Sequence, residues 1–224
     1  MGYYIDLEQI SIEDYGNILR STHLIPSWKI LKENMDINLE TIKKKGIHNL
    51  RQLQETLKQK DDLQEFSKQS GLPEQYLTVL RRMINGYQSK PNRIKDFPET
   101  SKDIILTLEK TGIKNTRHLY DKIITPNDRA LLSKQTGIGD QEILRLTKLT
   151  DLCRIRWVNH TFAYVLYEAG YDTAEKVANA NPELLYDTIK QLNAERKFYA
   201  AHIGLNDMKM LVESANMISL DIKY

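Results

Sequence analysis

The stretch FSKQSGLPEQYLTVL, residues 66–80, returns later in the chain as LSKQTGIGDQEILRL, residues 132–146, and this pair decides the fold. Gly71 and Gly137 occupy the same place in the two copies, 66 residues apart. Ser, Lys, Gln and Gly stay in register between them. Self-similarity at a fixed period is the signature of a repeat architecture.

Two further stretches extend the repeat. KKGIHNLRQL at 44–53 matches KTGIKNTRHL at 110–119 with the same offset. A third, looser copy begins at EAGYDTAEKV (168–177) and ends at AHIGLNDMKMLVESA (201–215). Two separate pairs of matching stretches with the same offset are improbable by chance. We therefore interpret the chain as an array of repeats.

Each copy is typical of short helices. No segment shows the sustained alternation of apolar and polar residues that indicates a strand. A helix often ends at a residue with left-handed backbone conformation, which favours glycine. Such helix ends are predicted at Gly46, Gly71, Gly112, Gly137 and Gly170. Helix starts are predicted at the capping side chains Asn49, Asn115 and Thr173, at Thr125 before Pro126 and at Asn181 before Pro182.

The spacing of Asp172 and Glu175 also predicts a capping box. We therefore predict an all-α protein of about a dozen short helices, built of tandem helix-hairpin-helix-like (SAM-like) repeats with no sheet.

The repeats divide the chain into two regions. We predict an N-terminal repeat region over residues 1–86 and a C-terminal core over residues 96–224. A basic linker, residues 87–95, joins them and contains Pro91.

Composition narrows the class of protein. The chain has 224 residues, of which 41% are hydrophobic and 28% charged, as in ordinary globular domains. A net charge of +2 does not by itself demand a polyanionic partner. Cys153 is the only cysteine, which excludes an internal disulfide and predicts a buried thiol.

Neither a signal peptide nor a membrane span is expected. The first residues carry acidic rather than basic side chains, and no apolar stretch approaches the ~18 residues that a span needs. We expect a cytoplasmic protein without membrane contact.

No catalytic or cofactor motif is present. The chain has no nucleophile elbow, P-loop or dinucleotide fingerprint. The histidines lack metal-ligand spacing; they are His23, His48, His118, His160 and His202. We predict that the protein is not an enzyme and has neither a metal nor a cofactor.

One segment resembles a known family. DLCRIRWVNHTFAYVLYEAGYDTAEKVANANPELL, residues 151–185, is similar to the bacterial family called domain of unknown function 4332, whose signature includes DL-x-RI-x-GVG and a later NP-x-x-L. The positions that fall on the pattern are Asp151, Leu152, Arg154, Ile155, Val158, Ala163, Leu166, Ala169, Gly170, Thr173, Val177, Asn181, Pro182 and Leu185.

Other stretches extend the resemblance to most of the chain. Residues 4–19 resemble the family's opening hairpin, residues 136–144 its central one and LVESANMI its closing helix, with residues 31–97 an apparent duplication. The resemblance implies the fold and no particular activity.

The glycine pair of a DNA-binding hairpin is absent. In a G-h-G hairpin (h, hydrophobic) the glycines let the backbone approach a phosphate, which the following helix N-terminus receives. Trp157 and Asn159 stand at these positions in the hairpin that best fits the signature. Gln9 with Ser11, and Glu99 with Ser101, replace the pair in two others.

Basic side chains gather in two places. Residues 81–95 contain cations suited to a phosphate backbone, with Tyr87 available to stack on a base; the cations are Arg81, Arg82, Lys90, Arg93 and Lys95. The second group surrounds the hairpin: Arg154, Arg156, Trp157, Asn159 and His160. We expect the two arginines of the hairpin to be exposed, because charged flanks of a turn are seldom buried.

Two functions remain open. One is sequence-independent binding of a nucleic-acid (DNA) backbone through the basic hairpin and linker residues. The other is a helical scaffold for protein–protein interaction or self-association, with a solvated linker and a Trp157 that packs against a neighbouring repeat.

Overall fold

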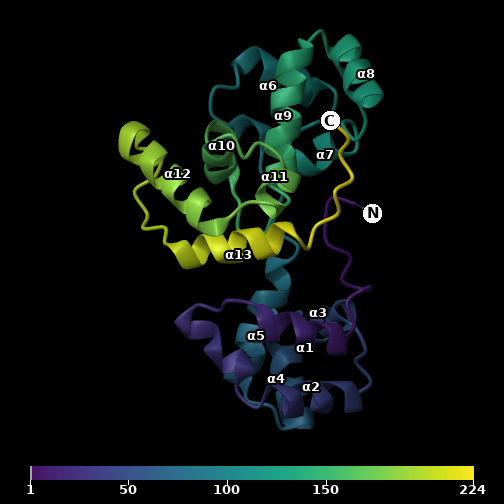
Figure 1. The fold of residues 1–224 in the computed structure, drawn as a ribbon. Coiled ribbons are helices and arrows are strands. Elements are labelled where there is room, and N and C mark those ends of the chain that lie inside the picture. The colour runs from purple at the N-terminus through teal and green to yellow at the C-terminus, as the bar shows by residue number, and fades with distance from the viewer. Residues whose placement is uncertain (1) are drawn as a thin grey trace. The chain divides into compact units, whose positions relative to one another are not determined.

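A computed structural model describes residues 2–224, which form two compact units (Figure 1). One unit comprises residues 5–88, and the other combines residues 2–4 with residues 89–224. The described part of the chain contains helices and two isolated β-bridges but no strand. The prediction of an all-α fold without a sheet is confirmed.

The helices of the first unit bury their apolar faces against one another. The elements are α1 (Ile12–Ser21), the 3₁₀ helix η1 (Pro26–Lys32), α2 (Met35–Lys44), α3 (Leu50–Thr56), α4 (Lys60–Ser70) and α5 (Glu74–Gly86). Helix α5, whose buried side chains include Leu77 and Leu80, contacts α3, α4 and η1. None of these helices is long enough to bury its apolar face alone, so each depends on its neighbours.

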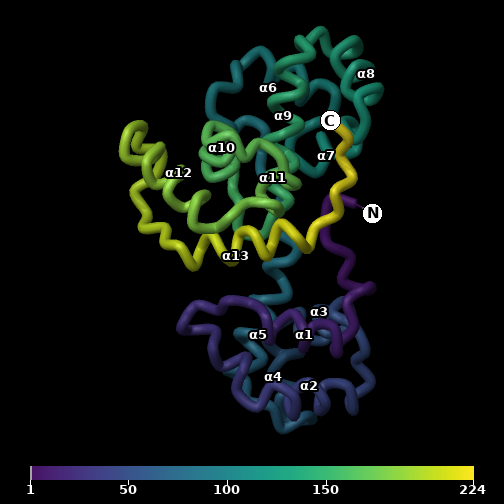
Figure 2. The backbone as a smooth tube through the Cα atoms, in the orientation of Figure 1, coloured from purple at the N-terminus to yellow at the C-terminus, as the bar shows by residue number. Residues whose placement is uncertain are grey.

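The second unit is larger and centres on α9. Its elements are η2 (Ile94–Asp96), α6 (Lys102–Lys110), α7 (Thr116–Tyr120), α8 (Pro126–Thr136), α9 (Asp140–Leu152), α10 (His160–Glu168), α11 (Ala174–Ala178), α12 (Pro182–Arg196) and α13 (Leu205–Ala215). Helix α9 contacts α7, α8 and α10, and α13 contacts α11 and α12. The tube in Figure 2 shows the chain after α13 returning past α11 toward α7.

The internal sequence repeat is accompanied by matching helix boundaries. Helices α4 and α8, and α5 and α9, begin and end 66 residues apart. The turn between them is built identically: Ser67 Oγ donates to the Leu72 carbonyl at 2.6 Å, and Ser133 Oγ donates to the Ile138 carbonyl at 2.8 Å. The same short sequence therefore produces the same turn in both units.

Most of the predicted helix boundaries are confirmed. All five glycines expected at helix ends have positive φ, between 72° and 84°. The side chains of Asn49, Asn115, Thr125, Thr173 and Asn181 each accept a hydrogen bond from a backbone amide of the helix that they precede.

The capping box predicted at Asp172 is wrong. Thr173 is the N-cap of α11, and Asp172 is instead paired with Lys148 and Lys176. Cys153 is buried, as predicted, and burial raises the pKa of its thiol. No helix among residues 2–224 is long and apolar enough to cross a bilayer.

Candidate nucleic-acid interface

Arg154 is a buried structural residue rather than an exposed cation. Its side chain is fully buried and donates from Nη1 to Asp151 Oδ1 at 2.9 Å. The expectation that this arginine is exposed is wrong, because Asp151 sits one helical turn earlier at the end of α9 and draws the guanidinium inward. Burying a guanidinium requires such a partner.

The same guanidinium also binds segments from both ends of the chain. Nη2 donates to the Ser219 carbonyl at 2.7 Å and to the Gly2 carbonyl at 3.4 Å, and Nε donates to the Tyr3 carbonyl at 3.5 Å. Its central carbon lies 4.8 Å from the centre of the Tyr120 ring. Arg154 therefore joins α9, residues 2–3 and residue 219 into one packed unit.

Asp151 completes this cluster. Its Oδ2 accepts from the Ala174 amide at 2.9 Å, at the start of α11, and from the Tyr224 hydroxyl at 3.0 Å. Burial raises the pKa of Asp151, while Arg154 and these two donors favour its charged form. The D and R of the signature D-L-x-R-I thus serve the fold.

Trp157 lies at the tip of the next turn. Its side chain is 43% exposed and its φ is 68°, in the left-handed region where the family pattern has glycine. Glu99, which replaces the same glycine in another hairpin, also has positive φ, at 58°. Trp157 and Glu99 therefore keep the left-handed backbone that suits the missing glycine, whereas Gln9, at the same position of the first hairpin, does not.

Arg156 supports the Trp157 ring. Its guanidinium carbon lies 4.0 Å from the ring centre, and the residue itself is only 3% exposed. The expectation that Arg156 is exposed is also wrong: its side chain packs against the indole instead of extending into solvent. A guanidinium at this distance is attracted by the ring electrons, so Arg156 holds the indole in place.

The N-terminus of α10 is already satisfied by protein side chains. Asn159 Oδ1 accepts from the Phe162 amide at 2.9 Å, and Asn92 Oδ1 accepts from the His160 amide at 3.0 Å. Two amides that would receive a phosphate at a helix N-terminus are thus occupied. The sequence places Asn159 at a position of the missing glycine pair, without a predicted capping role, and contains no signal for Asn92.

Asn92 also brings part of the basic segment beside the hairpin. Lys90, Arg93 and Lys95 are exposed and belong to the same unit as Trp157. Arg93 Nε donates to Asp96 Oδ2 at 2.8 Å, and this hydrogen bond lowers the pKa of Asp96. Asp96 therefore stays charged at neutral pH and competes with a phosphate for Arg93.

The remaining predicted cations lie in the other unit. Arg81 and Arg82 are on α5, and Arg82 is the more exposed of the two. Tyr87 is 3% exposed, so the expectation that it is available to stack on a base is wrong. Its ring packs against Tyr15 in the core of that unit.

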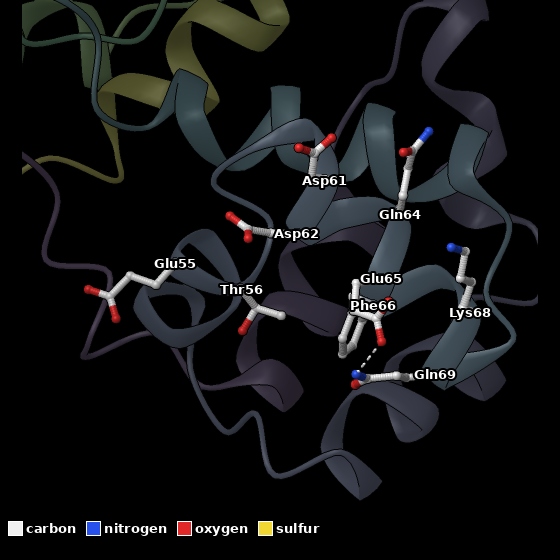
Figure 3. Close-up of a pocket in the computed structure, with 9 residues that line it drawn as sticks. All are labelled: Glu55, Thr56, Asp61, Asp62, Gln64, Glu65, Phe66, Lys68 and Gln69. Atoms are coloured by element: carbon white, nitrogen blue, oxygen red, sulfur yellow. Dashed lines mark hydrogen bonds between the residues drawn. The ribbon is translucent and has the colours of Figure 1, made fainter.

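The first unit also carries an acidic recess, shown in Figure 3. Its carboxylates are Glu55, Asp61, Asp62 and Glu65, with Lys68 the only cation in the lining. Asp62 accepts from the Gln59 amide at 3.0 Å, and Glu65 accepts from the Gln69 side chain at 2.9 Å. Because carboxylates repel a polyanion, we expect no nucleic acid to bind at this recess, and the lysines near it are suitable sites for control substitutions.

No metal-binding arrangement is present in the part of the chain that the structure describes: no three His, Cys, Asp or Glu side chains gather closely enough to hold an ion.

Comparison with known proteins identifies a family and nothing closer. The pattern that defines the family Domain of unknown function (DUF4332) matches residues 98–218, all of them within the second unit. Residues 4–19 and 31–97, to which the sequence resemblance also extends, lie outside this match. Searches of the curated proteins and of the solved structures return no match. With more than half of its length matched, the chain belongs to the DUF4332 family.

Proposed function

We propose that this protein is a non-enzymatic module that binds the backbone of nucleic acids without sequence preference. The binding surface would comprise the exposed cations Lys90, Arg93 and Lys95 together with Trp157 and His160; we call it the hairpin surface. The helix-hairpin-helix interpretation of the repeats is part of the same proposal.

One observation carries the proposal: the conformation and exposure of Trp157. A large apolar side chain is held partly in solvent on a left-handed backbone, which costs free energy in a bulky residue. Such strain clusters at functional sites. An aromatic ring beside cations is also the arrangement with which proteins bind nucleic acids irrespective of sequence.

The charge of the surface indicates weak, salt-sensitive binding. Its cations are few, and Asp96 competes for Arg93. Side-chain cations that neutralise phosphates release counterions, so the affinity falls steeply as salt increases. We therefore expect binding near 50 mM salt that largely disappears at physiological ionic strength.

The test is a charge reversal on the hairpin surface with a matched control. The variant Lys90→Glu/Arg93→Glu/Lys95→Glu is compared with Lys58→Glu/Lys60→Glu/Lys68→Glu, which changes the net charge equally at exposed positions of the first unit. Binding of a labelled oligonucleotide is followed by fluorescence anisotropy across a salt series.

We expect the first variant to lose binding and the control to retain most of it. In single variants, each lost phosphate contact should make the slope of log affinity against log salt concentration shallower by about one. Absence of binding by the parent at about 50 mM salt, a regime in which such contacts are strong, would overturn the proposal and leave the helical scaffold as the function. Equal loss in the two variants would show that only net charge matters, which also contradicts it.

A further inference from the structure

The geometry of the hairpin points to a single-stranded polynucleotide, rather than a duplex, as the ligand of the hairpin surface. This inference rests on the proposed function and specifies its partner. Three features of the second unit support it: the occupied N-terminus of α10, the supported indole of Trp157 and the form of the basic segment.

The first feature removes the contact with which a helix N-terminus holds a duplex phosphate. The His160 and Phe162 amides donate to the side-chain oxygens of Asn92 and Asn159. The backbone of Asn92 is itself fixed, because its N–H donates to Thr116 Oγ1 at 3.1 Å and its main-chain carbonyl accepts from the Thr116 amide at 2.9 Å. A phosphate would have to displace the side chain of a residue whose backbone is anchored.

The second feature is an aromatic ring that fits an unpaired base. Base faces are already stacked on each other inside a duplex, and inserting a side chain between them requires unstacking. A single strand presents its base faces without this cost, and every base has one, so stacking tolerates any sequence. The guanidinium of Arg156, 4.0 Å from the Trp157 ring centre, holds the ring in position for such a contact.

The third feature is the shape of the cationic segment. Lys90 and Arg93 precede, and Lys95 lies within, the three-residue helix η2, so the cations follow an irregular chain rather than one face of a long helix. An element that enters the major groove is a helix or a β-ribbon, and this segment is neither. Cations along an irregular segment suit a flexible backbone that adapts to them.

The test compares one labelled strand of about 15 thymidines with a labelled duplex of the same length, a size within the range that single-strand sites cover. Both are titrated with the full chain at low salt. The variants are Trp157→Ala, which removes the ring, Trp157→Gly, which suits the left-handed backbone and serves if the alanine variant fails to fold, and Trp28→Phe as the control in the first unit.

We expect the parent to bind the single strand about ten-fold more tightly than the duplex, which is the effect of one stacked base. Loss of the ring should remove this preference by weakening single-strand binding more than duplex binding, and Trp28→Phe should change neither affinity. Equal or tighter duplex binding by the parent, or a preference that survives loss of the ring, would overturn the inference and leave the proposed function standing. Absence of binding to both ligands would overturn the proposed function itself.

Discussion

Helices α5 and α9 match in length and in boundaries, but the residues at their C-terminal ends differ in charge and in burial. Asn85 and Gln88 at the end of α5 stand where Asp151 and Arg154 stand at the end of α9, 66 residues later. In both units the later residue of the pair reaches back to the start of its unit. Gln88 donates to the Ile5 carbonyl at 3.4 Å, and Arg154 to the Tyr3 carbonyl at 3.5 Å.

The difference lies in charge and burial. The first unit uses amides: Gln54 donates to Asn85 at 3.1 Å, and Arg51 donates to Gln88 at 3.4 Å, at partly solvated positions. The second unit buries an ion pair and binds the chain after α13 through it. The residue pair at the end of the helix, which we call the junction, is thus neutral in the first unit and charged in the second. Arg154, although basic, is a structural residue.

The largest expected effect is on stability, and it distinguishes the buried ion pair at the end of α9 from the neutral junction at the end of α5. Arg154→Ala leaves Asp151 buried without its cation, and loss of one partner of a buried pair costs about 3–5 kcal/mol. Trp157 reports on the second unit and Trp28 on the first, so urea unfolding is followed in Trp28→Phe and Trp157→Phe backgrounds. We expect the Trp157 transition to move to lower urea and the Trp28 transition to stay.

The exposed change Arg82→Ala serves as the control and should move neither transition. A shift of less than about 1 kcal/mol for Arg154→Ala, the worth of an exposed pair, would contradict the structural role of the ion pair.

The second prediction concerns the turn that the two units share, where a glycine-to-alanine change should cost the same stability in each unit. Gly71 and Gly137 have φ of 76° and 72°, and an added Cβ would meet open space at both. Alanine at either position should therefore cost only the left-handed conformation, about 1–2 kcal/mol. The same two single-tryptophan backgrounds measure each cost in its own unit; costs that differ by more than about 1 kcal/mol would break the equivalence of the turns.

A pH-dependent contact is specific to the second unit. Burial opposes ionisation of Asp172, but hydrogen bonds from Lys148 and Lys176 outweigh it and hold the pKa of this carboxyl below its ordinary value. A lowered pKa stabilises the folded state above the unfolded pKa of about 3.9, and this contribution is lost as the pH falls.

Asp172→Asn should therefore destabilise the second unit by about 1 kcal/mol at pH 7. It should cost less at pH 3, as measured by urea unfolding at both values. A cost that grows toward pH 3 would show that the sign of the pKa shift is wrong.

The smallest effect belongs to the neutral junction. Gln88→Ala removes hydrogen bonds of 3.4 Å, which are long and weak, so the first unit should lose no more than about 0.5 kcal/mol. A loss as large as that of Arg154→Ala in the other unit would remove the distinction between the two junctions.

The fold could be predicted from the sequence where short-range chemistry decides it. Helix ends at Gly71 and Gly137, and caps at Asn49 and Asn115, follow from φ preferences and nearby amides. The site could be predicted less well, because exposure depends on contacts between residues distant in the chain. Arg154 is buried by residues 2, 3 and 219, and no local pattern indicates these partners.

The most direct test of the proposed function is the fluorescence of Trp157 itself. In the Trp28→Phe protein this indole is the only tryptophan, and it lies at the surface to which we assign binding. Addition of unlabelled single-stranded oligonucleotide at low salt should quench its emission and saturate at the concentration where anisotropy saturates, because a stacked base contacts the ring. Unchanged Trp157 emission while the oligonucleotide is bound would place the binding site elsewhere and contradict the account.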